Sequence, residues 1–386
     1  MTRSGRPGHR FGVSAAERGT MAKPDRGPLR IGLLLESALT PELWSGVPLG
    51  LAQGLQANGA EVVPLITLPD LLERAARRLP MWRARAGLRY AGATHQVRKA
   101  SQLDAILQIG SSTAVDIELP LVFFLDMTLR QALEVRDEWV LSHPVRERQS
   151  WERRQQRLYQ RSDRILTMGA WAADSVVRDY GVDSSRVHVV GGGATHTVDA
   201  SSRDWSTPRF LFIGRDYERK NGPAVVRAFA TLRSEHPDAT LDIVGDHPRI
   251  DQAGVTGHGR LALGDLAGRA QVERLLRRAT CLVVPSVYEP FGIVYTEAAF
   301  AGIPSIATTV GAEFVDSSCG RRVTPGDEAG LLAAMRELSD PALARCLGDN
   351  ANARSRLFTW PIVGGRVLRA FAEVLGRPVD NLPDYL

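Results

Sequence analysis

Short apolar runs alternate with amphipathic stretches along most of this chain of 386 residues. The first apolar run, at 29–36, is followed by a helical pattern that ends at Asn58-Gly59 and then by a second run at 61–65. Further apolar runs follow at 104–110, 120–125, 164–168 and 187–190. Strands that alternate with helices in this way are typical of a parallel sheet covered by helices on both faces. The pattern therefore predicts a doubly wound α/β domain over residues 29–200.

A polar stretch at 199–208, which contains three serines, separates this series from a second one. The second series has apolar runs at 209–214, 239–244, 281–284 and 304–307. Hydrophobic residues make up 44% of the chain, which is enough to build two cores of ordinary size. We therefore predict a second Rossmann-like domain over 201–360. The periodicity of the C-terminal helical stretch, 361–386, leaves open whether it stays on the second domain or crosses back to the first.

Residues 1–28 are rich in Arg, Gly and Pro and lack the apolar centre of a signal peptide. We expect this segment to be a disordered leader. No stretch approaches 18 uninterrupted apolar residues, and the three cysteines, Cys281, Cys319 and Cys346, have no metal-binding spacing. These features predict a cytoplasmic protein with no structural metal.

The net charge of +5, from 48 basic and 43 acidic residues, is weak for a chain of this length. We therefore expect no nucleic-acid partner. One segment, residues 74–99, combines eight basic residues with Leu, Met and Trp. It is interpreted as a solvated, Arg-rich helix pair beside an acceptor cleft, and the alternative is peripheral contact with an anionic membrane.

The strongest local motif occupies residues 285–297 and has two carboxylates eight positions apart, Glu289 and Glu297. Gly292 allows a ligand to approach the backbone closely, and the N–H groups of residues 291–293 would point out of a helix start toward an anion. This arrangement predicts a phosphate site. The alternative is an ordinary strand-to-helix turn in which Glu297 is solvated.

A second motif follows the first strand of the second domain, at 214–222. Arg215 and Lys220 in such a loop can neutralise a diphosphate, the first as a bidentate fork and the second as a point charge. Arg219 competes with Lys220 for this role, and we favour Lys220. The alternative is a solvated basic loop. Because both loops follow carboxyl ends of strands in one sheet, the topology brings them to the same rim.

These residues resemble the donor-binding domain of retaining GT-B glycosyltransferases of family 4, the glycosyl transferases group 1. Arg215 and Lys220 follow a Phe-Ile-Gly sequence, and Glu289 and Glu297 match the Glu-x7-Glu pattern of that family. The resemblance extends to Trp-Ser-Gly-Val-Pro at 44–48, to Asp-Met-Thr at 126–128 and to 162–171. It covers roughly residues 29–375 and implies two Rossmann-like doubly wound domains that face a central cleft.

The resemblance implies a glycosyltransferase that moves a sugar from a nucleoside diphosphate to an acceptor hydroxyl with retention of configuration. Neither a cofactor nor a metal is expected. The acceptor, a small molecule, a glycan or a lipid-linked compound, would bind mainly to residues 29–200. Glu289 would contact the transferred sugar, Glu297 the ribose, and Gly245 would lie beside the nucleoside. The donor-binding residues so implied are Gly46, Gly214, Gly245, Pro290, Phe291, Gly292, Ile293 and Glu297. The catalytic residues so implied are Glu289, Arg215, Lys220 and Asp126.

One departure from the family concerns the first domain. Many relatives have a His close to the sugar, often as His-Asp, whereas Leu125 precedes Asp126 here. Asp126 either contacts the acceptor or caps the following helix, and the sequence leaves both roles open. Two further functions on the same fold also stay open: a nucleotide-sugar epimerase or pseudo-glycosyltransferase, and a nucleotide-sugar-binding protein without catalysis.

Overall fold

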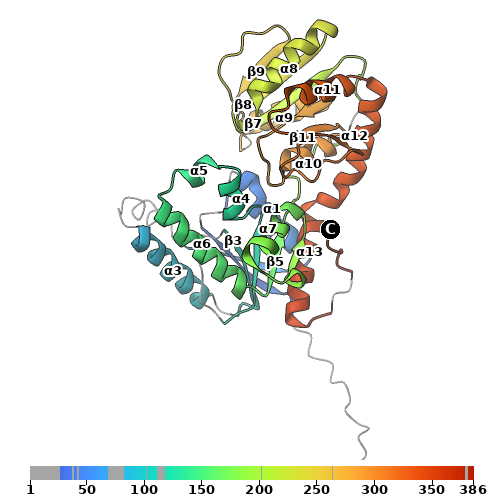
Figure 1. Cartoon of the computed structure of the whole chain (residues 1–386). Coiled ribbons are helices and arrows are strands. Elements are labelled where there is room, and N and C mark those ends of the chain that lie inside the picture. Colours follow the sequence, from blue (N-terminus) through green and yellow to red (C-terminus); the bar gives the residue numbers. More distant parts are fainter. Residues whose placement is uncertain are drawn as a thin grey trace, which may run out of the picture.

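The structure is a computed structural model. It describes residues 27–36, 39–40, 43–67, 82–100, 102–110, 118–200, 202–262, 264–378 and 381–386, with side chains in the helix at 82–99 from residue 87 on. Nearly all of the predicted leader, and much of the basic segment at 74–99, lies outside these residues. The described chain forms two α/β domains, one above the other in Figure 1.

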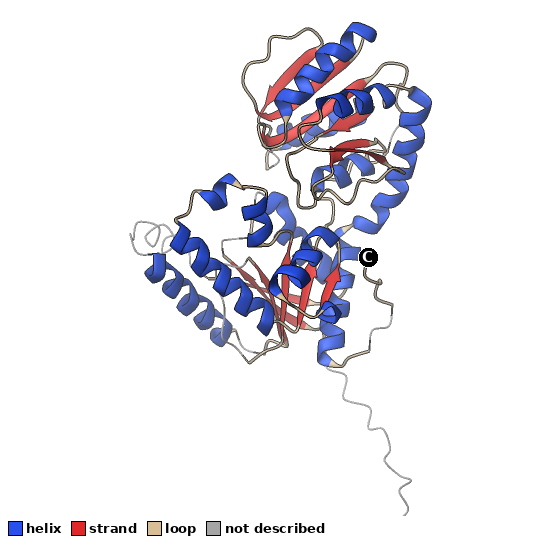
Figure 2. Cartoon of the chain, in the orientation of Figure 1, coloured by secondary structure: helices blue, strands red, loops and turns tan. Residues whose placement is uncertain are grey.

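The first domain is built on a six-stranded sheet in the order β2-β1-β3-β4-β5-β6. All of its strand pairs are parallel. The strands are β1 (Arg30–Leu35), β2 (Glu61–Ile66), β3 (Ala105–Ile109), β4 (Leu121–Leu125), β5 (Arg164–Thr167) and β6 (Val187–Val189). In the central strands β3 and β4 every residue is buried, because helices cover both faces of the sheet. Figure 2 shows these helices on either side of the strands.

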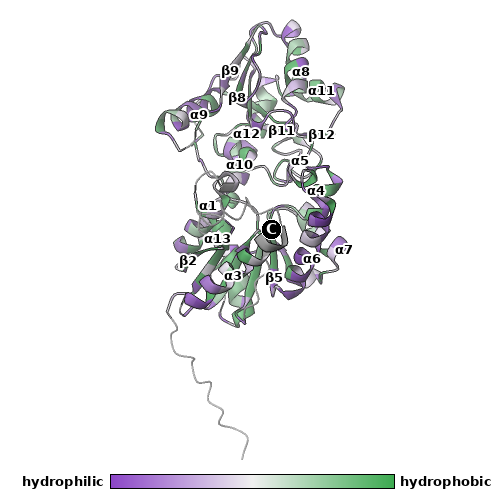
Figure 3. Cartoon of the chain, turned by 90° about the vertical axis from the view of Figure 1, so that its left-hand side faces the viewer, coloured by the Kyte–Doolittle hydropathy of each residue, from purple (hydrophilic) through white to green (hydrophobic). Residues whose placement is uncertain are grey.

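The helices of this domain are α1 (Val47–Ala57), α3 (Trp82–Lys99), α4 (Leu129–Glu134), α5 (Glu138–Leu141), α6 (Val145–Arg161) and α7 (Ala170–Tyr180). α7 ends at Gly181, whose left-handed φ of 64° is typical of a glycine that ends a helix. α6 begins at Val145, directly after Pro144 at its N-cap, and its first turns are polar. Polar residues predominate on the outer helices in Figure 3, and the strands are hydrophobic.

The second domain repeats this plan with the strand order β12-β11-β10-β7-β8-β9, again all parallel. Its strands are β7 (Arg209–Asp216), β8 (Thr240–Asp246), β9 (Val255–Gly259), β10 (Cys281–Val283), β11 (Ser305–Thr308) and β12 (Gly320–Val323). Its helices are α8 (Gly222–Glu235), α9 (Leu266–Arg278), α10 (Ile293–Phe300), α11 (Glu328–Glu337) and α12 (Pro341–Ser355). The sequence analysis had not assigned β9 and β12, because these two edge strands are short and polar and lack an apolar run.

The last helix, α13 (Trp360–Leu375), packs against α1 of the first domain. Glycines allow the two helices to approach closely. A Cβ on Gly50 would lie 2.1 Å from the Trp360 ring, and one on Gly54 would lie 2.0 Å from the Trp360 carbonyl oxygen. Asn58 Nδ2 also donates to the Pro361 carbonyl oxygen at 2.7 Å. The chain therefore crosses between the domains twice, and the two crossings are joined by a hydrogen bond of 3.0 Å from Ala194 N to the Phe358 carbonyl oxygen.

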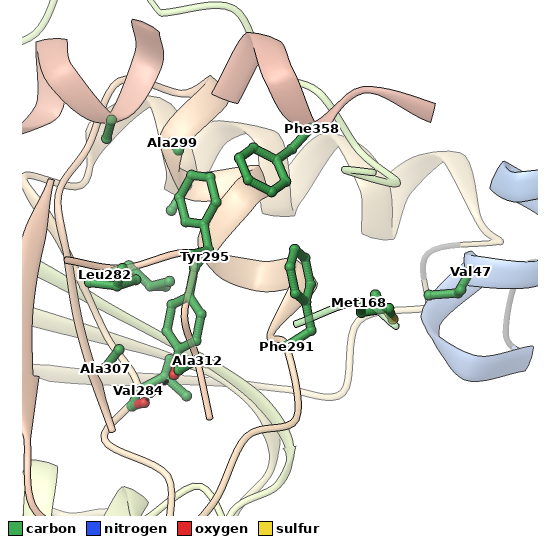
Figure 4. Packing of buried hydrophobic residues seen from close by; sticks show 14 of the residues in the cluster. Val47, Met168, Leu282, Val284, Phe291, Tyr295, Ala299, Ala307, Ala312 and Phe358 are labelled. Carbon is green, nitrogen blue, oxygen red and sulfur yellow. Dashed lines mark hydrogen bonds between the residues drawn. The ribbon is translucent and has the colours of Figure 1, made fainter. Parts of the chain in front are cut away.

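Both sheets reverse their winding direction in the middle, between β1 and β3 and between β7 and β10. In doubly wound sheets, ligands bind beyond the carboxyl ends of the strands at this point. The apolar core continues across the junction of the domains. Figure 4 shows Phe291 of the second domain beside Met168 of the first. No helix among the described residues is both long and apolar enough to cross a membrane.

Candidate active site

A cavity of about 860 Å³ lies between the domains. The first domain contributes Trp44, Ser45, Val47, Asp126, Met168 and His196 to its lining. From the second domain the lining includes Gly214, Arg215, Arg219, Lys220, Gly245, Glu289, Pro290, Phe291, Gly292, Ile293 and Glu297. The two loops that the sequence placed at one rim therefore meet in one cavity. Residues 260–262 and 264–265, beyond β9, line its far side.

The loop after β7 lies close to the end of β8. A Cβ on Gly245, whose φ is 137°, would stand 1.8 Å from the Gly214 carbonyl oxygen. A Cβ on Gly214 would meet Lys220 Cδ at 2.4 Å, so the stem of the lysine lies over this glycine. Gly245 is required by its contact with backbone, whereas a side chain at Gly214 would displace the flexible stem of Lys220. Arg215 is exposed at the cavity wall and has no ion-pair partner in the part of the chain that the structure describes.

Glu289 lies in the loop after β10 and is nearly buried, with 8% of its surface exposed. Its Oε2 is 2.7 Å from Lys220 Nζ and accepts a hydrogen bond of 3.2 Å from Ser286 Oγ. Burial disfavours the charge, but the charges of Lys220 and Arg219 and the bonds from Lys220 and Ser286 hold the pKa of Glu289 below its ordinary value. The two loops are thus joined by an ion pair inside the site.

Arg219, the competitor of Lys220, supports the neighbouring loop. Its Nη1 donates to the Tyr288 carbonyl oxygen at 2.9 Å, and its guanidinium lies 5.0 Å from the centre of the Tyr288 ring. Its Nε is also 3.4 Å from Asp216 Oδ2. Arg219 therefore has three contacts that fix it in place, although it also lines the cavity.

The start of α10 faces the same cavity. Gly292 is its N-cap and has a left-handed φ of 84°. The Phe291 side chain belongs to the core, with 3% exposed. This residue can therefore contribute to the cavity mainly through its backbone. The first N–H groups of a helix have no partner within the helix and attract an anion.

Glu297, in the second turn of α10, reaches the junction of the domains. Its Oε1 accepts a hydrogen bond of 3.1 Å from the backbone N–H of His196. Burial raises the pKa of Glu297 to about 7, against the opposing effects of that hydrogen bond and of the charge on Lys220. The structure therefore places this carboxyl in the cavity, next to the backbone of the first domain.

Asp126 follows β4 and faces the cavity from the first domain. The capping alternative for this residue is wrong, because Thr128 is the N-cap of α4 and forms a complete capping box with Gln131. Burial raises the pKa of Asp126 to about 6, and the negative charge of Glu289 contributes to the same shift. The two carboxyl groups are therefore electrostatically coupled across the cleft.

Gly46 is not among the residues that line the cavity, whereas its neighbours Trp44, Ser45 and Val47 are. Its φ of 82° makes the turn into α1 possible. The Ser45 carbonyl oxygen accepts a hydrogen bond of 2.8 Å from Thr195 Oγ1. This segment is therefore fixed against the loop around Thr195 that crosses between the domains.

Two contacts between the domains were missed by the sequence analysis. The hydroxyl of Tyr288 donates to Asp137 Oδ2 at the N-terminus of α5. The carboxylate of Glu313 accepts a hydrogen bond of 3.0 Å from the N–H of Trp171 in the first turn of α7. No local pattern marks these residues, because each contact joins positions more than 140 apart. Within the described residues, no group of three His, Cys, Asp or Glu side chains could hold a metal.

Two facing Rossmann-like domains with a cavity between them define a GT-B protein. Residues 207–340, most of the second domain, match the model of the family described as glycosyl transferases group 1. The expected resemblance to the glycosyl transferases group 1 is thereby confirmed for this part of the chain.

Curated relatives are similar to this chain over part of its length. Glycogen synthase from Mycobacterium tuberculosis is 33% identical over 243 residues, which cover 58% of this chain and 57% of that protein. D-inositol 3-phosphate glycosyltransferase from Streptomyces coelicolor is 30% identical over 242 residues, 52% of each chain. The chain thus spans little more than half the length of these relatives.

Sucrose-phosphate synthase from Thermosynechococcus elongatus superposes on 90% of this chain and 99% of its own with a TM-score of 0.66 at 20% identity. Anabaena HepE, solved in complex with UDP and glucose, superposes on 89% of this chain and 100% of its own with a TM-score of 0.64 at 16% identity. These likenesses show the fold.

Proposed function

We propose that this protein transfers a sugar from a nucleoside diphosphate to an acceptor hydroxyl, with retention of configuration and without a metal. One observation carries the proposal. Arg215, Lys220 and the start of α10 converge on a single cavity that also contains Glu289 and, from the opposite domain, Asp126. A site for such a donor needs positive charge to bind the diphosphate. It also needs carboxylates to accept hydrogen bonds from the sugar hydroxyls.

The cations would stabilise the leaving group. When the bond from the sugar to the diphosphate breaks, negative charge grows on the phosphate oxygens. Fixed positive groups and aligned N–H donors at that position lower the barrier, because they need no reorganisation during the reaction. Among the described residues Arg215 has no ion-pair partner, and Lys220 is held in place by Glu289. These groups would take over the charge neutralisation that a divalent cation provides in other phosphoryl sites.

Glu289 would orient the transferred sugar. Its Oε2 is occupied by Lys220 and Ser286, whereas its Oε1 has no donor among the described residues. A carboxylate oxygen held in this way accepts a hydrogen bond from a sugar hydroxyl and fixes the ring above the diphosphate. Glu297, at the junction of the domains, would accept a bond from the ribose in the same manner.

Asp126 would hold the acceptor hydroxyl on the side of the first domain. Retention without a covalent intermediate requires the acceptor to approach on the face that the diphosphate leaves. The leaving phosphate oxygen would then take the proton of the acceptor, and the sugar would gain the new oxygen bond as the old one breaks. A carboxylate beside the acceptor hydroxyl orients it for this transfer.

Binding of the donor is the first test. A nucleotide at about 100 times its dissociation constant adds roughly 2.7 kcal/mol to stability, enough for a shift of several degrees in Tm. We expect one of UDP, GDP, ADP, TDP and CDP to raise the Tm of the wild-type protein, and to raise the Tm of Lys220→Ala much less. If none of these nucleotides raises the Tm of the wild-type protein, the proposed binding of a nucleoside-diphosphate donor is contradicted.

Catalysis is the second test. The donors on the selected base are assayed with acceptors suggested by the relatives: glycogen, maltooligosaccharides and inositol 3-phosphate. NMR of the product gives its anomeric configuration, and an arm with EDTA tests the need for a metal. Glu289→Ala should lose turnover strongly and nucleotide affinity only slightly. Epimerised donor, or nucleotide binding with no product from any acceptor in the panel, would favour the two other functions on this fold.

A further inference from the structure

The far wall of the cavity is formed where β8 and β9 end. Its lining there includes Gly245 and Asp246 at the end of β8 and residues 260–262, the β9 loop, directly after β9. Strands β10, β7, β8 and β9 are neighbours in this order, so the carboxyl ends of β10 and β9 lie about 14 Å apart at the usual strand spacing. A donor with its sugar beside Glu289 and its diphosphate beside Lys220 would therefore place its nucleoside against the β9 loop (Figure 1).

An irregularity at the end of β9 turns the chain toward the cavity. The pairing of β8 with β9 skips His258, which lies between the partners of two consecutive residues of β8. The next residue, Gly259, has a left-handed φ of 63°. A bulge of this kind ends the pairing and redirects the strand, and bulges are common next to active sites. Because the β9 loop begins directly after Gly259, its position depends on the contacts that fix this glycine.

The side chain of His247, which directly follows β8, holds Gly259. The backbone N–H of Gly259 donates to Nε2 of His247 at 3.1 Å. Since Nε2 accepts this bond, the proton of the neutral ring is on Nδ1, which donates to the Pro248 carbonyl oxygen at 2.8 Å. The ring lies over Gly257, where a Cβ would stand 2.3 Å from His247 Cε1. Both ring nitrogens are therefore used, and the half-buried imidazole joins the end of β8 to the bulge in β9.

The other contacts of the β9 loop hold its base and its far end. At the base, Nε2 of His258 lies 2.7 Å from Oδ1 of Asp242 in β8. At the far end, the backbone packs against the first turn of α9, where a Cβ on Gly268 would stand 2.4 Å from the Ala262 carbonyl oxygen. Asp265 caps that helix by accepting a bond of 3.3 Å from Gly268 N. A segment that is fixed at both ends loses little conformational entropy when a ligand binds.

We propose that His247 is a positioning residue for the donor, which holds the β9 loop where the nucleoside would contact it. The inference rests on the proposed function and assigns the fit of the nucleoside to this side chain. His247 is not among the residues that line the cavity, so it acts through the backbone of Gly259. Without its hydrogen bond the bulge could relax, and part of the binding energy of the nucleotide would then be spent on ordering the loop.

Two substitutions separate the roles of the two ring nitrogens. Glutamine places an amide near the position of Nε2 and can accept from Gly259, whereas asparagine places its amide near Nδ1 and does not reach Gly259. The Kd of UDP, GDP, ADP, TDP and CDP is measured by calorimetry. For the nucleotide that binds most tightly, His247→Asn should raise the Kd about fivefold to tenfold, the effect of one hydrogen bond, and His247→Gln about twofold at most. His236→Asn is the matched control, because His236 is a half-buried histidine after α8 of the same domain.

Two further measurements distinguish positioning of the β9 loop from general damage to the domain. The Kd of inorganic pyrophosphate, measured by competition with the nucleotide, should be unchanged in His247→Asn, because pyrophosphate needs only the cations and the start of α10. This arm is needed because the rings of His247 and Tyr217, in the loop of Lys220, have their centres 6.2 Å apart. Hydrogen exchange over residues 255–265 should be faster in His247→Asn than in the wild-type protein and His247→Gln, and unchanged elsewhere in the domain.

Equal nucleotide Kd values for the wild-type protein and His247→Asn would overturn the inference, and the donor site would stand. An equal loss of affinity for nucleotide and pyrophosphate would mean that the whole site is distorted and would overturn it as well. So would unchanged hydrogen exchange over residues 255–265, because Gly259 would then be held without the histidine. A wild-type protein that binds none of the nucleotides contradicts both this inference and the proposed function.

Discussion

Replacing Lys220 with alanine should leave a buried carboxylate without its main partner. Lys220 Nζ lies 2.7 Å from Glu289 Oε2, and the two side chains are only 13% and 10% exposed. Removing one partner of a buried pair costs about 3–5 kcal/mol. Ser286 at 3.2 Å and Arg219 at 3.9 Å stay beside the carboxylate. We therefore expect the lower end, a loss of about 3 kcal/mol in the free energy of unfolding of the second domain.

A double-mutant cycle isolates the pair. Glu289→Gln keeps the shape of the side chain, and Lys220 can then turn toward the water in the cavity, so this variant should lose only about 1 kcal/mol. The double variant should be more stable than Lys220→Ala by about 1 kcal/mol or more, because no buried charge remains in it. Lys99→Ala, which removes an exposed lysine at the end of α3, is the control.

Thermal unfolding at two pH values is the assay. For a domain of this size, about 3 kcal/mol corresponds to a decrease in Tm of about 6–12 °C at pH 7. In the wild-type protein the pKa of Glu289 lies below its ordinary value of 4.5, so the pair stabilises the fold at pH 7 and this contribution is lost as the pH falls below 4.5. In Lys220→Ala, burial predominates and raises that pKa, so the carboxyl binds a proton in mild acid. The Tm difference should therefore shrink between pH 7 and pH 4.

Two results would refute this reasoning. Strictly additive effects in the cycle would mean that the carboxylate does not depend on the lysine. A Tm difference that is the same at pH 7 and pH 4 would mean that the carboxylate of the variant is hydrated and keeps its ordinary pKa.

Three further predictions concern single residues. Gly245→Ala should destabilise the second domain by about 3 kcal/mol or more in urea unfolding, because its Cβ would stand 1.8 Å from the Gly214 carbonyl oxygen at a φ that alanine avoids. With the pKa of Asp126 raised to about 6 by burial, kcat/KM should fall as the pH drops below about 6, and Asp126→Asn should lower kcat about 100-fold while the Kd for nucleotide is unchanged. With the pKa of Glu297 raised to about 7 by burial, the free energy of unfolding should decrease as the pH rises from its ordinary 4.5 to 7, and Glu297→Gln should be more stable than the wild-type protein at pH 8 by about 1 kcal/mol.

Each of these predictions has a contrary outcome. If the unfolding curves of Gly245→Ala match those of the wild-type protein, the ends of β7 and β8 can move apart to admit the Cβ without loss in the free energy of unfolding. A pH profile of kcat/KM that is flat between pH 5 and pH 7 would remove the carboxylate of Asp126 from the acceptor site. Lower stability of Glu297→Gln than of the wild-type protein at pH 8 would show that the ionised carboxylate and its bond to His196 stabilise the domain junction.

The loops of the site could be predicted from sequence because each is a local pattern. Arg215 and Lys220 follow an apolar run directly, and Glu289 and Gly292 follow another. Parallel topology then brings the ends of both runs together, since adjacent parallel strands end at one edge. The structure places all four residues in the lining of the cavity between the domains, together with Glu297.

The partners of these residues could not be predicted. That Lys220 pairs with Glu289, or that Tyr288 reaches Asp137, depends on side-chain directions in loops from different parts of the chain. The role of Asp126 was open for a related reason. Both Asp126 and Thr128 can cap a helix, and only the geometry shows that Thr128 does so. The edge strands β9 and β12 were missed because their residues are half exposed and lack an apolar run.

The two crossings of the chain lie side by side, joined from Ala194 to Phe358, and this makes them a natural hinge axis. Opening of the cleft would then be a rotation about that axis, with displacements that grow with distance from it. Glu297 contacts His196, two residues from the axis, and would move little. Tyr288 and Asp137 meet near α5, on the opposite side of the molecule from α12 and α13 in Figure 1. Their hydrogen bond lies far from the rotation axis, where displacements are large. It would therefore be among the first contacts to break as the domains open.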